Sequence, residues 1–132
     1  MPIVVDTSTV IAVAGNEPLK PRLIAVTRGE ELVAPAGLPW EIGNAVSAMF
    51  KRKRASLDQG LALIAQYRQI PIRLLDVSVE ASVTLAATLN IYAYDAYMIQ
   101  CAKDTGFPLL SLDAGLVAAA RRAGVAIIEV TP

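Results

Sequence analysis

Four acidic residues follow apolar stretches, which separates them from the other acids of the chain. They are Asp6 in Ile-Val-Val-Asp, Glu41 in Leu-Pro-Trp-Glu, Asp95 in Tyr-Ala-Tyr-Asp and Asp113 in Leu-Ser-Leu-Asp. We expect Asp6 and Asp113 to end strands, and the other two to open helices. Four carboxylates in one half-buried pocket would repel one another unless a divalent cation neutralised them. Such oxygen ligands suit Mg²⁺ or Mn²⁺, and hydrolysis of a phosphodiester is a common use of the site.

Each of these acids also has a simpler interpretation. Asp6, Asp95 and Asp113 could be ordinary helix N-caps, and Glu41 could be an ordinary acid in a first helical turn. The remaining acids lie mostly among polar or turn residues, a position typical of solvated surface charge. The joint placement of the four therefore carries more weight than any one of them.

Composition narrows the chemistry further. The 132 residues include no histidine and one cysteine, so histidine-based triads, common zinc sites and an intrachain disulfide are excluded. Twelve basic and 12 acidic residues give a formal net charge of zero. No global basic field is available for nucleic-acid binding, and the balance predicts low solubility and hence a partner. No signal peptide or membrane span is evident, which predicts a cytoplasmic protein.

The elements that must position these acids alternate along the chain. The pattern predicts strands over 3–5, 32–34, 72–75, 108–112 and 125–130. It predicts helices over 7–14 (with Ser8 or Thr9 near the cap), 21–28, 40 to about 53, 56 to about 68, 78 to about 89, 94–104 and 114–123. This alternation favours one α/β domain over 1–132, with a parallel sheet covered on both faces. Ligands bind such sheets beyond the carboxyl ends of the strands, where the strand order reverses.

Four segments in order resemble the PIN-domain ribonucleases, and more narrowly the VapC toxins of bacterial and archaeal toxin–antitoxin pairs. They are Val-Val-Asp-Thr-Ser at 4–8, Pro-Trp-Glu-Ile-Gly-Asn-Ala at 39–45, Tyr-Asp-Ala-Tyr-Met-Ile-Gln-Cys-Ala at 94–102 and Leu-Leu-Ser-Leu-Asp at 109–113. The resemblance spans essentially the whole chain. It implies a single PIN domain, a three-layer α/β/α sandwich with a central, mainly parallel sheet of four to five strands.

The resemblance also implies a role for each matching residue. Asp6 would be the central metal ligand, and Glu41 would complete the site or orient the attacking water. Asp95 would bind the metal directly or through water, and Asp113 would close the ring. Two further residues would support the site: Ser8 matches a hydroxyl common after the first aspartate, and Asn44 could orient Glu41 from one helical turn away. Their ordinary alternatives are a helix cap and a surface amide.

The activity implied by the resemblance is endonucleolytic RNA cleavage that depends on Mg²⁺ or Mn²⁺ and leaves a 5′-phosphate and a 3′-hydroxyl. The implied partners are an RNA substrate, a cognate VapB-like antitoxin and a second copy of the chain, without a membrane. The alternative is a catalytically silent PIN-like scaffold that binds RNA or protein. Receiver domains and haloacid-dehalogenase-like phosphatases fit less well, because Thr7 and Ser8 stand where those folds need a second acid.

Other features have an ordinary interpretation and a functional one. The basic run 51–54 fits a solvated helix end or a distant contact with RNA phosphates, about 20 Å from Glu41. Tyrosines 92, 94 and 97 could stack on an RNA base, but core or dimer packing is the more common use. We expect Trp40 to staple its helix into the core, and Cys101 to be a buried free thiol.

Overall fold

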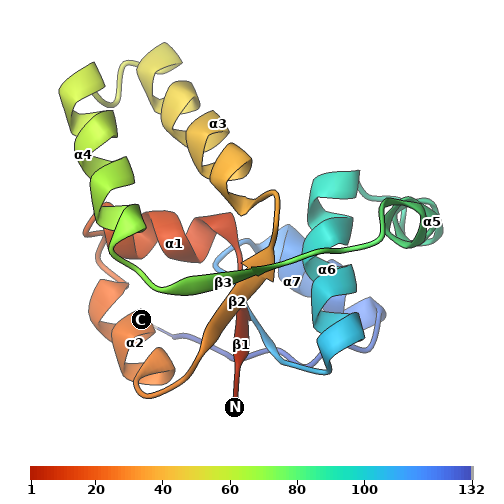
Figure 1. Cartoon of the computed structure of the whole chain (residues 1–132). Coiled ribbons are helices and arrows are strands. Elements are labelled where there is room, and N and C mark those ends of the chain that lie inside the picture. The colour runs from red at the N-terminus through yellow and green to blue at the C-terminus, as the bar shows by residue number, and fades with distance from the viewer. Residues whose placement is uncertain (132) are drawn as a thin grey trace.

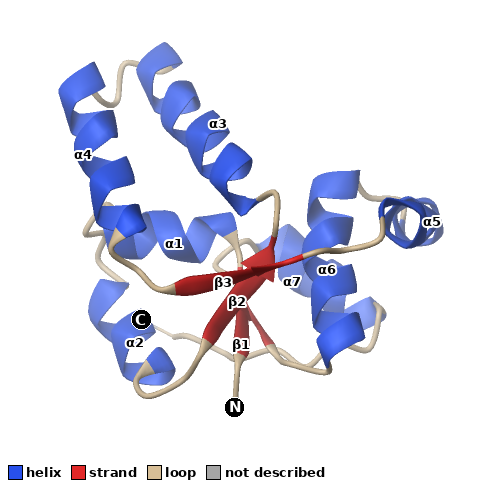
Figure 2. Ribbon diagram, viewed as in Figure 1, coloured by secondary structure: helices blue, strands red, loops and turns tan. Residues whose placement is uncertain are grey.

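Four parallel strands form the centre of the fold. The computed structural model describes residues 1–131. Its strands are β1 (Ile3–Val5), β2 (Leu32–Pro35), β3 (Ile72–Leu75) and β4 (Leu109–Leu110). They lie in the order β3-β2-β1-β4, and each neighbouring pair is parallel (Figure 2). All three residues of β1 are buried, as expected for a central strand with both faces covered. The predicted α/β class with a mainly parallel central sheet of four to five strands is therefore confirmed, with four strands formed.

Seven helices surround this sheet in the described residues. They are α1 (Thr7–Ala14), α2 (Lys20–Thr27), α3 (Leu38–Lys51), α4 (Leu57–Arg68), α5 (Val79–Leu89), α6 (Ala93–Thr105) and α7 (Ala114–Arg122). Figure 1 shows α1 and α2 on one side of the sheet and α5 and α6 on the other. Helices α3 and α4 pack together as a hairpin that projects beyond the sheet. None of the helices in residues 1–131 has the length and apolar character needed to cross a membrane.

Local signals set most helix ends close to their expected positions. Pro39 lies in the first turn of α3, where proline costs no intrahelical hydrogen bond. Ser56 and Gln59 form a reciprocal capping box at the start of α4. Gly106, with φ of 75°, adopts the left-handed conformation that ends α6. Asp6 is the N-cap of α1 and accepts a hydrogen bond from the Thr9 amide, as its simpler interpretation predicted, and Ser8 and Thr9 lie in the first turn that follows.

The strand predicted over 125–130 is not formed. A single bridge joins Leu109 to Ile127, and the rest of this segment has no ladder. The cause is the shortness of β4, which ends at Leu110 instead of continuing to Leu112. Beyond that point the Leu112 amide donates to the Ser8 hydroxyl instead of to a neighbouring strand. The segment 125–130 therefore pairs with β4 at one residue, Leu109.

A glycine lets the two helices of the hairpin approach closely. A Cβ atom on Gly60 of α4 would lie 2.4 Å from Cζ of Phe50 and 2.8 Å from Cγ1 of Val46, both on α3. The face of α3 toward the core includes Ile42 and Val46, which are buried. The hairpin thus has its own packed interface, and its base holds the start of α3 beside the ends of the strands.

The chain reverses its direction across the sheet between β1 and β4. From β1 it moves to β2 and β3 on one side, and then returns to place β4 on the other side of β1. β1 is followed directly by Asp6, and β4 is followed by two residues and then Asp113. This is the region where an open parallel sheet is expected to bind a ligand.

Candidate active site

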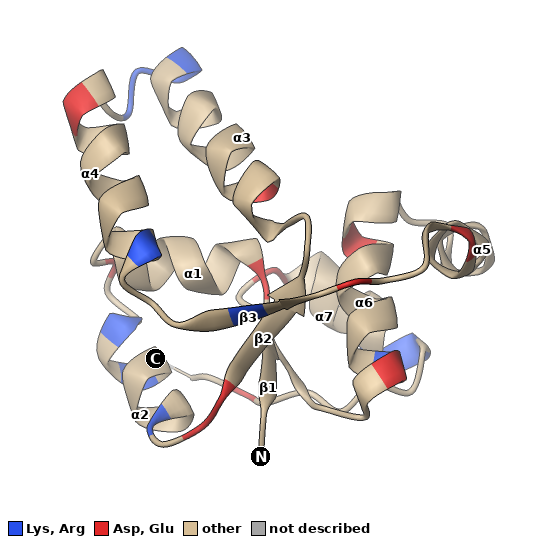
Figure 3. Ribbon diagram, in the orientation of Figure 1, with Lys and Arg blue, Asp and Glu red and all other residues tan. Residues whose placement is uncertain are grey.

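The four acids singled out in the sequence lie around this region. Asp6 is the N-cap of α1 and Asp113 is the N-cap of α7. Glu41 lies in the first turn of α3, and Asp95 lies in the first turn of α6. The N-cap of α6 is Tyr92, so Asp95 is not a helix cap. Figure 3 shows acidic positions near the starts of α1, α3 and α6, around the carboxyl ends of the strands.

Asp6 is a buried carboxylate held by three donors. Asp6 is only 4% exposed. The Ser8 hydroxyl lies 2.8 Å from both carboxylate oxygens, the Thr9 amide donates to Oδ1 at 3.0 Å, and the Ser111 hydroxyl donates to Oδ2 at 2.5 Å. A carboxylate offers about four acceptor positions, so three donors leave room for one further ligand.

The hydroxyls around Asp6 also join β1 to the segment after β4. Ser8 accepts a hydrogen bond of 2.9 Å from the Leu112 amide, and Ser111 accepts one of 3.0 Å from the Asp113 amide. Thr9 donates to the Leu110 carbonyl at 3.0 Å. Asp6 and Asp113 are consequently fixed relative to each other by backbone and side-chain bonds, although their positions in sequence are far apart.

Glu41 is the most perturbed acid of the group. Burial, as the largest cause, raises its pKa from the ordinary 4.5 to about 7. A hydrogen bond from the Thr7 hydroxyl, 3.4 Å from Oε1, acts in the opposite direction, while the charges of Asp6 and Asp95 raise the pKa further. A carboxyl group that titrates near neutral pH is suited to hold or release a proton during a reaction.

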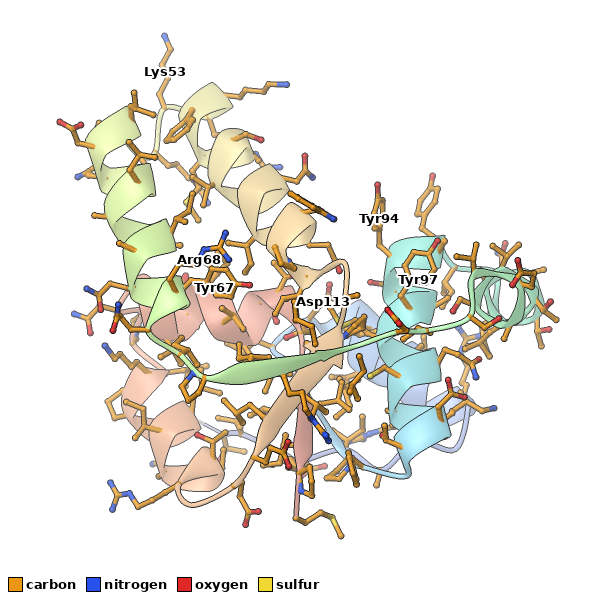
Figure 4. All side chains as sticks on the ribbon, in the orientation of Figure 1. Lys53, Tyr67, Arg68, Tyr94, Tyr97 and Asp113 are labelled. Carbon is orange, nitrogen blue, oxygen red and sulfur yellow. The ribbon has the colours of Figure 1, made fainter. Side chains whose placement is uncertain are left out.

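Asp95 and Asp113 complete the electrostatic group in different ways. Burial raises the pKa of Asp95, and the charges of Asp113 and then Asp6 raise it further. Asp113 is exposed, and its Oδ1 accepts hydrogen bonds from the amides of Gly115 and Leu116. Figure 4 shows the Asp113 side chain in the central region between α3 and α6. The charges of Asp6 and Asp95 thus act on Glu41, and those of Asp113 and Asp6 act on Asp95.

The carboxylate oxygens of these four acids suit a hard divalent cation, but the four side chains do not surround a common metal position. In residues 1–131, no three Asp, Glu, Cys or His side chains are arranged to hold a metal ion as they stand. The two acids with raised pKa values would each be stabilised in the charged form by a nearby cation. The arrangement can thus attract a divalent cation, with ligation by all four acids left as a proposal.

A cleft of ≈490 Å³ opens beside Glu41. Its lining residues are Thr7, Trp40, Glu41, Asn44, Ala45 and Tyr94. Asn44 faces the cleft and is exposed, and the side-chain partner of Glu41 among the described residues is Thr7 instead. Thr7 was missed in the sequence because the hydroxyl directly after a possible N-cap has no distinctive spacing.

One expectation about the aromatic residues was wrong. Trp40 does not staple α3 into the core but is 80% exposed. It lies two residues from Leu38 and from Ile42, both buried, and so falls on the opposite side of the helix. That spacing was visible in the sequence and could have corrected the expectation. Tyr92 and Tyr94 are 86% and 67% exposed, whereas Tyr97 is half-buried.

The basic run lies away from the acids. Residues 51–54 are all exposed, and Figure 4 shows Lys53 at the far tip of the α3–α4 hairpin. Glu41 is at the opposite end of α3, so the expected separation is confirmed. A contact of this run with RNA stays a prediction. Cys101 is buried and unpaired, as expected, and burial raises the pKa of its thiol to about 11.

The chain matches a known protein family and shares its fold with solved structures. The family described as the PIN domain matches residues 3–122. No curated protein matched the sequence.

Three solved structures share the fold at low sequence identity. PAE2754 from Pyrobaculum aerophilum is 21% identical, with a TM-score of 0.69 over 90% of this chain and 84% of that one. The sarcin-ricin loop cleaving toxin VapC20 of Mycobacterium tuberculosis is 16% identical, with a TM-score of 0.64 over 98% of this chain and 99% of that one. FitAcB from Neisseria gonorrhoeae is 19% identical, with a TM-score of 0.66 over 96% of both chains.

Proposed function

Because this chain belongs to the PIN domain family, we propose that it is a metal-dependent endoribonuclease and the toxin of a VapC-type toxin–antitoxin pair. The observation that carries the proposal is the electrostatic coupling of the four acids at the strand ends. Burial is the largest cause of the raised pKa values of Glu41 and Asp95. The charges of Asp6 and Asp95 raise that of Glu41 further, and those of Asp113 and Asp6 raise that of Asp95 further. Mutual repulsion of this kind destabilises an ion-free site and favours one that binds a cation.

Asp6, Glu41, Asp95 and Asp113 would hold Mg²⁺ or Mn²⁺, some of them through water, which Mg²⁺ usually retains. A bound cation of this type polarises a phosphoryl group, promotes ionisation of a water and stabilises the leaving oxygen. The donor set supports this assignment, since carboxylate oxygens are the ligands preferred by both ions.

The protein's own residues would position the acids and the attacking water. Asp6 is fixed by the hydroxyls of Ser8 and Ser111 and cannot rotate without breaking those bonds. Glu41, which lines the cleft and contacts the Thr7 hydroxyl, would complete the metal site or orient the attacking water. The Thr7 hydroxyl would hold the Glu41 carboxyl in one orientation through its 3.4 Å contact. RNA would then be cut to leave a 5′-phosphate and a 3′-hydroxyl.

Three further assignments belong to the same proposal. A VapB-like antitoxin would bind the chain, a second copy would form a homodimer, and the protein would act in the cytoplasm, where RNA is available. The zero net charge supports a need for partners. The similarity of the fold to VapC20, itself a toxin, supports the antitoxin assignment.

A non-cleaving scaffold is the second candidate. It is favoured by one observation: the acids of residues 1–131 do not enclose a metal position as they stand. A scaffold of this family would bind RNA or protein over the same cleft without needing a divalent cation.

The deciding experiment compares cleavage of total RNA by the wild-type protein and by Asp6→Asn, with Mg²⁺, with Mn²⁺ and with a chelator. Asparagine is also a good N-cap, so α1 should keep its start. We expect the wild type to cut only with metal, and Asp6→Asn to be inactive. Asp76→Asn is the matched control, because Asp76 is an exposed acid that follows β3 as Asp6 follows β1. Equal cleavage by wild type and Asp6→Asn would overturn the nuclease assignment.

A further inference from the structure

Two exposed aromatic side chains line the cleft beside the acids. Trp40 is 80% exposed on the first turn of α3, and Tyr94 is 67% exposed on the first turn of α6. Both line the same cleft as Glu41. Each directly precedes one of the two acids whose pKa values are raised, Glu41 and Asp95. Figure 4 shows Tyr94 pointing from α6 away from the sheet.

The packing of the fold does not account for this exposure. The buried face of α3 is formed by Leu38, Ile42 and Val46, and Trp40 is on the other side of the helix. On α6, Met98 lies one turn after Tyr94 and is buried, but Tyr94 itself, at the start of the helix, is 67% exposed. A large aromatic surface left in water beside an acidic site is a feature of ligand recognition rather than of folding.

The lining of the cleft indicates what kind of ligand these rings would bind. No lysine or arginine is among its six lining residues, so phosphate groups find no cationic side chain there. The faces of unpaired bases, by contrast, stack on aromatic side chains whatever their sequence. The volume of ≈490 Å³ lies within the range of about 300–1,000 Å³ of small-molecule sites, which accommodates a base.

We propose that Trp40 and Tyr94 form a stacking site for an unpaired RNA base next to the carboxylate group. The site would make a single-stranded segment necessary for recognition, because bases within a duplex already stack on their neighbours. Binding energy from the base would hold the adjoining phosphate near the acids, where no basic side chain lines the cleft. This inference rests on the proposed nuclease function and specifies the form of its RNA substrate.

The protein carries a built-in probe for this site. Trp40 is the one tryptophan in the chain, so its emission reports on the cleft alone. The titrants are a short single-stranded RNA of mixed sequence, the same RNA annealed to its complement, and an abasic strand of equal length. Wild-type protein is titrated with a chelator present, and Asp6→Asn with Mg²⁺, so that the RNA stays intact. We expect the single strand to quench Trp40, and the duplex and the abasic strand to leave its emission nearly unchanged.

Variants of the tyrosine separate stacking from general binding. Tyr94→Ala should weaken single-strand binding roughly 5- to 150-fold, and Tyr94→Phe, which keeps the ring, should restore it. Tyr92→Ala is the matched control: Tyr92 is 86% exposed two residues away but does not line the cleft. In cleavage assays Tyr94→Ala should raise KM for single-stranded RNA much more than it lowers kcat.

Each outcome separates this inference from the nuclease proposal. Metal-dependent cleavage without selective quenching would overturn the stacking site and leave the nuclease standing. Selective quenching without cleavage would support the stacking site and favour the non-cleaving scaffold. Equal quenching by the abasic strand would overturn the inference, since bases would then be unnecessary. Emission that changes with protein concentration, but not with RNA, would also overturn it, by identifying the cleft as a protein interface.

Discussion

The Ser111 hydroxyl donates a 2.5 Å hydrogen bond to Oδ2 of Asp6, although 105 residues separate the two in sequence. Both residues are buried, and they follow β1 and β4, the strands on either side of the reversal in strand order. The bond therefore orients a carboxylate at the centre of the candidate site from the neighbouring strand. Because the Ser111 hydroxyl contacts the acid and does not line the cleft, we expect Ser111 to position Asp6.

Ser111→Ala should weaken the response of the enzyme to metal. Loss of a hydrogen bond that orients a metal ligand typically costs about 10- to 100-fold in metal affinity or activity. We expect the Mn²⁺ concentration for half-maximal cleavage to rise, and Ser111→Thr to restore it. Thr88→Ala is the control, since Thr88 is an exposed hydroxyl that bonds only within α5. An unchanged metal requirement in Ser111→Ala would show that Asp6 does not need this bond.

Glu41 should make the metal-free protein less stable as pH rises from 4.5 to about 7. The unfolded chain loses the Glu41 proton near 4.5, whereas the folded protein keeps it until about 7. Between these values the folded state binds more protons, so the free energy of unfolding falls with rising pH and levels off above the window. We expect a loss of about 1 to 2 kcal/mol, because solvent screens a half-buried group. Urea denaturation with a chelator measures it.

The Glu41→Gln variant tests whether this residue is the source of the effect. Glutamine does not titrate, so most of the pH dependence across the window should disappear. A smaller slope of the same sign should remain from Asp95, whose pKa is also raised. An identical pH profile in wild type and Glu41→Gln would assign the effect to other groups.

Mn²⁺ should raise the melting temperature of the wild-type protein. At a free ion concentration of about 100 times Kd, binding stabilises the folded state by ~2.7 kcal/mol, or roughly 10 °C for a domain of this size. Asp95→Asn should reduce the shift, because it removes a proposed ligand and a source of repulsion. Asp76→Asn should behave as wild type. If Mn²⁺ leaves the melting curve unmoved, the four acids do not form a cation site.

The same substitution at two glycines should have opposite effects on stability. Gly60→Ala places a Cβ 2.4 Å from Phe50 Cζ, and the overpacking should cost about 1–3 kcal/mol. Gly43→Ala, in α3, meets no atom within 4 Å and should stabilise the helix by about 0.5–1 kcal/mol. Urea denaturation of both variants measures the difference. Stabilisation by both would contradict the close packing of α3 on α4.

Local chemistry explains why much of the fold could be predicted. Proline at 39, the capping serine at 56 and glycine at 106 act within one turn of their own positions, so each predicted helix lies close to the observed one. The segment 125–130 could not be assigned in this way. Its pairing depends on where β4 ends, which is determined by contacts from Ser8 and Asp6 more than 100 residues earlier.

The candidate site shows the same division. The four acids could be located from the apolar residues before them, because strand ends and helix starts meet at one edge of a parallel sheet. Their partners could not, since Thr7 and Ser111 reach Glu41 and Asp6 only in the folded chain. Trp40 is a different case: a helical wheel would have placed it away from the buried stripe, and the preference of tryptophan for the core was the wrong guide.

The segment 125–130, which runs parallel to β4 along its outer border, has a consequence for association between molecules. The Leu109 amide donates to Ala126, and the Leu109 carbonyl accepts from Ile128, so the outer border of β4 has its backbone groups occupied. A strand from another molecule cannot add there to lengthen the sheet. The opposite border, β3, remains open but carries the charged Arg73, which is paired with Glu31. Edge-to-edge aggregation is thereby discouraged on both sides, so the proposed homodimer would form through helical surfaces.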